Sequence, residues 1–176
     1  MSIVLDNGRV RVEIDEDHGR MVRAAHAGLG IEVVTEPRLA ENFRLLLPLP
    51  SRHGHYLAGR DQRLTGVRAG AQACTLSWDG LHGQDRRFDI EVTQTIRLSG
   101  DDITFQADLV NHSPFEVEEV SSIVLGGLGN SAERSDWRIH FADETGQGQE
   151  WLCYERFPAA TSARPGRCAP GCTRWS

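Results

Sequence analysis

The sequence predicts an all-β protein with the fold of an antiparallel β-sandwich. Apolar residues alternate with polar ones in many short runs, which is the period of strands with one face in water. Gly, Pro, Asn and Asp separate these runs, and no window carries a convincing apolar stripe at helical spacing. Strands joined by turns, without helices between them, favour an antiparallel sandwich over a parallel sheet.

The N-terminal strands follow from this alternation in chain order. In residues 10–14 three apolar residues alternate with Arg11 and Glu13, and turn-forming residues lie on both sides of the run. Proline cannot donate a hydrogen bond to a strand ladder, so Pro48 and Pro50 close a run that ends at Leu47. Further strands are therefore expected over residues 21–27, 31–34 and 43–47.

Residues 88–111 give the clearest pattern in the chain. Apolar side chains share one parity from Phe88 to Leu98, with Gln94 as the only exception. After a Ser-Gly-Asp-Asp turn the alternation restarts at Ile103 and continues to Leu109. Two alternating runs around such a turn predict an antiparallel hairpin. Strands in the same style are expected over residues 74–78, 115–125 and 137–141.

The composition predicts a sandwich domain over residues 2–157 and an irregular, disordered tail over residues 158–176. No Asp or Glu occurs from Arg156 to Ser176, although the chain holds 25 of them, and this stretch is rich in Arg, Pro, Gly, Ala and Cys. A GC-rich gene read out of frame yields that composition. A frameshifted or foreign end and a natural disordered tail are the two interpretations of this segment.

Charge and hydropathy exclude several classes of partner. A net charge of −6 argues against a nucleic-acid-binding surface and against an anionic membrane surface, since both attract basic patches. No apolar run reaches the roughly 20 residues of a membrane-spanning helix, and the N-terminus lacks a secretory pattern. The expected location is therefore cytoplasmic, with no nucleic-acid or membrane partner.

No motif in the sequence points to catalysis, a cofactor or a metal. Residues 127–132 fit G-x-G-x-x-A after an apolar run, but the crossover helix of a dinucleotide site is missing. Neighbouring acidic residues in turns do not form the opposed pair that a glycosidase needs, and no G-x-S-x-G occurs. Cys168 and Cys172 lack two further metal ligands nearby. We therefore assign no catalytic residue, no cofactor and no metal ligand.

Two groups of residues are candidates for contacting a ligand. Trp78 ends a strand beside Asp79 and close to His82, where an indole ring could stack on a sugar. The alternative is a tryptophan buried in the core, which is common in sandwiches. His53 and His55 follow two prolines, and they could contact a polar ligand, bind a metal, or simply lie in a solvated loop.

Several segments resemble a known kind of protein region. They include Asn7-Gly8-Arg9-Val10, Asp17-His18-Gly19-Arg20, Glu41-Asn42-Phe43-Arg44, Gly59-Arg60-Asp61-Gln62 and Trp78-Asp79-Gly80-Leu81. Their order resembles the N-terminal galactose-mutarotase-like β-sandwich region of large bacterial glycoside hydrolases. In such proteins the catalytic carboxylates usually lie in a separate, later domain. The resemblance implies an accessory sandwich of the super-sandwich kind, incomplete in this chain, that is associated with carbohydrate.

The sequence thus favours a non-catalytic, carbohydrate-associated β-sandwich, the N-terminal fragment of a glycoside hydrolase. One alternative is a small mutarotase-like enzyme that uses a His as general acid and a carboxylate as base. Another is a purely structural interaction module. The expected partners are a carbohydrate and either the missing catalytic domain or a second copy, through an apolar face that the missing domain would leave exposed.

Overall fold

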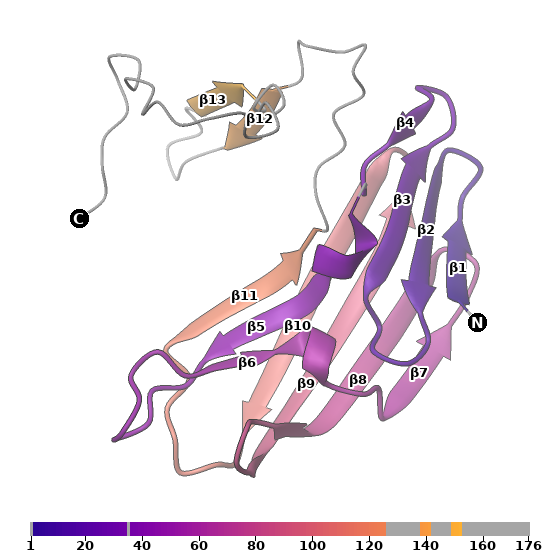
Figure 1. Ribbon diagram of the computed structural model, residues 1–176. Coiled ribbons are helices and arrows are strands. Elements are labelled where there is room, and N and C mark those ends of the chain that lie inside the picture. The colour runs from indigo at the N-terminus through magenta and orange to yellow at the C-terminus, as the bar shows by residue number, and fades with distance from the viewer. Residues whose placement is uncertain (1, 35, 126–137, 142–148, 153–176) are drawn as a thin grey trace, which may run out of the picture. The chain divides into compact units, whose positions relative to one another are not determined.

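The computed structural model describes residues 2–34, 36–125, 138–141 and 149–152, and it is all-β in these ranges (Figure 1). The chain divides into two units, residues 1–129 and 130–176. In the second unit, β12 (Arg138–Phe141) pairs antiparallel with β13 (Gln149–Leu152), which places Ile139 opposite Trp151.

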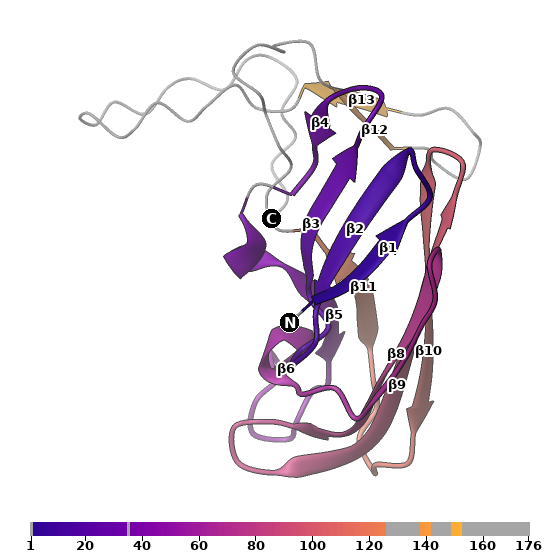
Figure 2. The ribbon, with the colours of Figure 1, turned by 90° about the vertical axis from the view of Figure 1, so that its right-hand side faces the viewer.

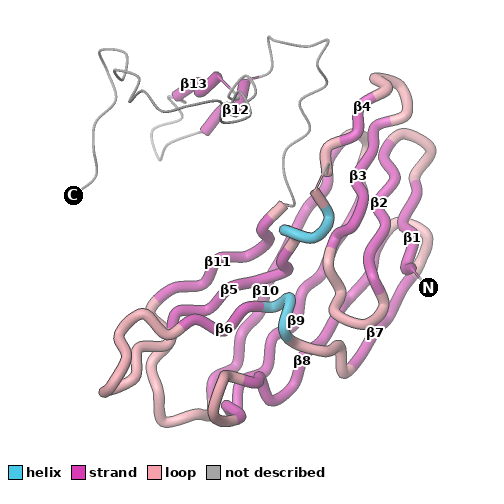
Figure 3. The backbone as a smooth tube through the Cα atoms, viewed as in Figure 1, coloured by secondary structure: helices cyan, strands magenta, loops and turns pink. Residues whose placement is uncertain are grey.

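Where the structure describes the first unit, its strands form three antiparallel sheets, and two short 3-10 helices lie between strands (Figure 3). The first sheet has the order β1 (Ser2–Asp6), β2 (Val10–Asp15), β3 (Met21–His26), β4 (Ile31–Glu32). The second has the order β10 (Asp102–Asn111), β9 (Arg87–Ser99), β8 (Ala73–His82), β7 (Gly66–Ala69). The third has the order β11 (Glu119–Val124), β5 (Glu41–Leu46), β6 (Tyr56–Ala58). The 3-10 helices are η1 (Pro37–Leu39) and η2 (Gly59–Asp61).

The sheets form the two layers of a sandwich. Figure 2 shows β1 to β3 and β5 along one side and β8 to β10 along the other. A single core of buried apolar side chains lies between them, with contributions from β1, β2, β3, β5 and β6 on one layer and β8 and β9 on the other. The predicted fold class, an antiparallel β-sandwich, is confirmed.

The long strand β9 shows how the sequence pattern builds the core. Buried and exposed residues alternate along most of it, and the predicted hairpin to β10 forms with Ile103 opposite Leu98 and Leu109 opposite Val92. Gln94, the polar exception in the pattern, occupies a core position and is 1% exposed. Its side-chain amide donates a hydrogen bond of 3.1 Å to the backbone carbonyl of Asn42, which accounts for a polar residue at this position.

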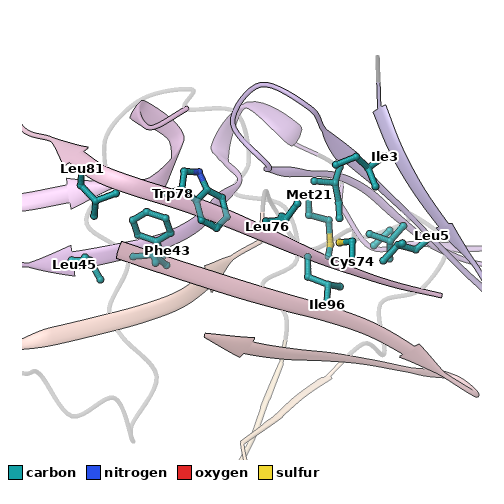
Figure 4. Packing of buried hydrophobic residues seen from close by; sticks show 14 of the residues in the cluster. Ile3, Leu5, Met21, Phe43, Leu45, Cys74, Leu76, Trp78, Leu81 and Ile96 are labelled. Carbon is teal, nitrogen blue, oxygen red and sulfur yellow. The ribbon is translucent and has the colours of Figure 1, made fainter. Parts of the chain in front are cut away.

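Trp78 is the largest of the fully buried side chains and lies near the middle of the core (Figure 4). Its ring meets that of Phe43 edge to face, with centroids 5.1 Å apart. Cys74, on the same strand, is also buried, and desolvation raises the pKa of its thiol to about 11. Such a thiol stays protonated at neutral pH and acts as a small apolar residue.

Asp15 organises the turn between β2 and β3. Its carboxylate accepts hydrogen bonds from the backbone N–H of Asp17, His18 and Arg20 and from the Arg20 guanidinium at 2.8 Å. Partial burial raises the pKa of Asp15, but the hydrogen bonds from His18 and Arg20 outweigh it, so the pKa lies below the usual aspartate value. Ionisation of this carboxyl group therefore stabilises the turn.

Acid is expected to weaken the fold through Asp15. Because its pKa is depressed in the folded chain, its stabilisation is complete above the unfolded pKa of about 3.9 and is lost as pH falls through the lower folded pKa. Asp15→Asn should reduce the free energy of unfolding by about 1–3 kcal/mol at pH 7 and by less under acid conditions. Urea titrations at several pH values measure this, with the exposed Asp17→Asn as the control. Equal losses from Asp15→Asn at every pH would contradict the assignment.

The predicted strands correspond closely to the observed ones. Strands expected over residues 10–14, 21–27, 31–34, 43–47, 74–78, 115–125 and 137–141 appear as β2, β3, β4, β5, β8, β11 and β12. β1, β6, β7 and β13 were not predicted. The expected tail, residues 158–176, the G-x-G-x-x-A segment and the cysteine pair lie outside the described residues, and the boundary at residue 157 stays a prediction.

Candidate functional site

A bulge interrupts the pairing of β8 with β9. The pairing shifts between Asp79 and Leu81, and Gly80 takes the left-handed conformation with φ +67°. The side chain of Arg87 lies across this bulge and donates hydrogen bonds to the carbonyls of Gly80 at 3.1 Å and Asp79 at 3.2 Å. A Cβ atom on Gly80 would overlap the Arg87 guanidinium, so this arrangement requires glycine.

Gln62 joins the segment after η2 to the end of β8. Its side chain is buried, and its amide exchanges two hydrogen bonds with the backbone of His82, accepting from N–H at 2.7 Å and donating to C=O at 2.9 Å. The same amide nitrogen donates to the carbonyl of Ala58 at 3.2 Å. The glutamine thus pairs with β8 as a neighbouring strand would, and it fixes where residues 61–65 run.

A pocket of about 430 Å³ lies between residues 61–65 and the β8 bulge. Trp78 and Leu81 line it from the core side and are both about 1% exposed, so the core forms its floor. Apart from the buried Gln62, the polar side chains around it are exposed, and they comprise Asp61, Arg63, Thr65, Asp79, His82 and Arg87. These groups include hydrogen-bond donors, carboxylate acceptors and an imidazole, and they suit a neutral ligand rich in hydroxyl groups.

The structure brings together three of the five predicted ligand-contacting residues. Trp78, Asp79 and His82 all line the pocket. Trp78 lies there as a core side chain, because at 1% exposure its ring has no face left open for stacking on a sugar. Its indole N–H is buried and finds no hydrogen-bond acceptor among the described residues, so a ligand or solvent oxygen that reached it would gain a donor.

His53 and His55 lie elsewhere, in the connection between β5 and β6. His53 is exposed, whereas His55 is buried and packs against Phe88 with ring centroids 5.4 Å apart. The two imidazoles therefore have different surroundings, one in solvent and one against the core. Neither lines the pocket beside the β8 bulge.

Sequence reasoning missed several residues that shape the pocket, namely Asp61, Gln62, Arg63 and Arg87. Asp61 and Gln62 belong to a segment that contributes to the family resemblance, but nothing in their spacing linked them to β8. Arg87 precedes the strongly alternating run and looks there like an ordinary exposed charge. Only the bulge at Gly80, which no strand pattern reveals, gives Arg87 its position.

An ion-pair cluster anchors the segment that carries Gln62. Glu41 is 1% exposed, and its carboxylate accepts two hydrogen bonds from Arg44, at 2.9 and 3.0 Å, and lies 3.0 Å from the Arg60 guanidinium. The hydrogen bonds that Arg44 donates to Glu41 raise the pKa of Arg44. Because Arg60 belongs to η2 and Glu41 to β5, the pair ties η2 to the sandwich. We therefore interpret this cluster as a structural support for the pocket.

In the ranges that the structure describes, no group of three or more His, Cys, Asp or Glu is placed to hold a metal ion. The helices in these ranges are too short and too polar to cross a membrane.

Comparisons with known proteins add no family to this picture. No protein-family model matches the chain, and no curated protein matches it. The resemblance to the sandwich region of glycoside hydrolases therefore stays an expectation from the sequence.

Proposed function

We propose that this protein is a non-catalytic carbohydrate-binding β-sandwich and that the pocket beside the β8 bulge binds the saccharide. The observation that carries the proposal is the convergence of Asp79 and His82 with Asp61 and Arg63 around one hollow over an apolar floor. Sugars present hydroxyl groups around their rim and C–H groups on their faces. The exposed donors and acceptors around the hollow match the hydroxyl groups, whereas the buried Trp78 and Leu81 side chains close its floor without offering a stacking face.

The two carboxylates and the imidazole have distinct parts in this proposal. Asp61 and Asp79 accept hydrogen bonds from sugar hydroxyl groups, and charge-assisted bonds of this kind are the stronger ones. His82 donates or accepts according to its tautomer, while its backbone is held by Gln62. Arg87 has its Nε and Nη2 donors engaged with backbone carbonyls, so it shapes the pocket more than it recognises the ligand.

Removing Asp79 is expected to weaken saccharide binding without unfolding the protein. Asp79→Ala should raise the dissociation constant by about 10- to 100-fold, the effect of one lost hydrogen bond to a charged group. Isothermal titration calorimetry of the full chain with a panel of mono- and disaccharides measures this. The exposed Asp85→Ala, which lies outside the pocket lining, is the matched control. Equal affinities for the two variants would sink the assignment of the pocket.

A second candidate function is favoured by one observation. His82 and two carboxylates, Asp61 and Asp79, line the same pocket, and an imidazole with a carboxylate is the pair that a mutarotase-like enzyme needs. NMR or polarimetry of freshly dissolved sugar with the full chain distinguishes the two functions. Anomer interconversion that disappears in His82→Ala would favour the enzyme, and a rate equal to that of buffer alone would favour binding without catalysis.

We further propose that the sandwich belongs with a catalytic domain of glycoside hydrolase type. The residue segments that resemble such proteins support this. Reading the coding DNA downstream in all three frames tests it. A barrel-type domain in any frame would support the proposal, and its absence would leave the sandwich as a binding module in its own right.

A further inference from the structure

The strand β10 presents an unusually complete edge. It is 10 residues long and lies at one margin of its sheet, paired only with β9. Among the described residues, none of its backbone groups bonds to anything outside that pairing. The other strands at the margins of the sheets are shorter, from two residues in β4 to six in β11. An exposed edge of this length is a template for another strand.

β10 lacks the features that usually protect an edge. It contains no proline and no basic residue, and its register with β9 runs without a bulge from Asp102 to Asn111. β7, at the other margin of the same sheet, has only four residues and carries Arg68 and Gly66. Pairing through this sheet is therefore expected at one edge only.

The core beside β10 is only partly covered. Ile103, Phe105 and Leu109 point toward the core but are half-buried, whereas their partners on β9 are fully buried. A strand added at this edge would continue the alternation and cover these side chains.

We propose that β10 pairs antiparallel with β10 of a second copy, about a two-fold axis at Gln106. In this register Phe105 faces the small Ala107 of the other copy, and Ile103 faces Leu109. Thr104 faces Asp108, so that a hydroxyl donor meets a carboxylate and no Asp faces an Asp. A register centred on Phe105 would instead place Asp102 opposite Asp108 twice, which like-charge repulsion disfavours.

A two-fold pairing of this kind closes on itself. Among the described residues each copy offers one long edge, and the short β7 edge of the joined sheet does not propagate the pairing, so the product is a dimer and not a fibre. This inference is independent of the proposed saccharide pocket, since β10 contributes no residue to that pocket.

Charge substitutions at Thr104 test both the edge and the register. Thr104→Lys places a cation opposite Asp108 at two symmetric positions, and Thr104→Asp places an anion there. Sedimentation equilibrium of the full chain should show a dimer that tightens by about 2- to 30-fold with Thr104→Lys and weakens by a similar factor with Thr104→Asp. Val67→Lys and Val67→Asp on β7 are the matched controls and should change nothing.

Three results would overturn the proposal. They are a chain that stays monomeric at the highest accessible concentration, a dimer in which both Thr104 variants act alike, and a dimer that responds to Val67. If the chain is monomeric, the β10 edge is instead open to pairing with a strand of a different protein. Circular dichroism of each variant confirms that the exposed Thr104 position tolerates the change and that the fold is retained.

Discussion

Trp78→Ala is expected to reduce the free energy of unfolding by about 3–5 kcal/mol. The indole is 1% exposed, packs edge to face on Phe43 and forms part of the pocket floor, so its removal leaves a cavity at the centre of the core. Chemical denaturation of the purified chain, followed by circular dichroism, measures the loss.

Trp78→Phe separates the packing of the ring from its N–H group. Phenylalanine keeps an aromatic ring against Phe43 and removes a buried donor that has no partner among the described residues. We expect this variant to lie within about 1.5 kcal/mol of the parent chain. A loss below about 1 kcal/mol for Trp78→Ala would contradict a central place of the indole in the core.

Gly19→Ala is expected to destabilise the fold by about 2–5 kcal/mol, the sum of backbone strain and overpacking. Gly19 has φ +75°, where a side chain is strained. A Cβ atom there would also lie 2.8 Å from Cζ2 of Trp78 and 3.0 Å from Nδ2 of Asn42, which is too close for carbon. Thermal unfolding reports the loss.

Gly8→Ala is the matched control for this variant. Gly8 also has a positive φ, +83°, and also lies in a turn between two strands of the first sheet, but a Cβ atom there would meet nothing within 4 Å. Only the strain of about 1–2 kcal/mol is expected. The difference between the two variants therefore isolates the packing of the β2–β3 turn on Trp78, and equal losses would mean that this contact is not tight.

The strands of the core could be predicted because one physical rule dominates them. In β9 the alternation of side chains between core and solvent leaves a direct trace in the sequence, and even its exception, Gln94, is a buried residue with a specific partner. β6 and β7 left no such trace. They have three and four residues, and β7 begins at a glycine and carries an arginine, so their pairing depends on neighbours that the local sequence does not reveal.

The candidate site was only half predictable for a similar reason. Trp78, Asp79 and His82 lie close together in the sequence at the end of one strand, so their proximity was evident. Their association with residues 61–65 depends on the side chain of Gln62, which pairs with the backbone of His82. A contact between a buried glutamine and a strand twenty residues later leaves no periodic signal. Trp78 stands out in the sequence as an aromatic residue, and the structure shows that it is buried in the core.

The most direct test of the whole account is to map where a saccharide contacts the chain. Two-dimensional amide NMR of the labelled protein, titrated with the tightest-binding sugar of the panel, reports on every backbone position. We expect the amide chemical shifts of Arg63, Gly80 and His82, around the pocket beside the β8 bulge, to change. No shifts with any sugar, or shifts confined to the hollow lined by Arg68, Thr75 and Thr93, would contradict it.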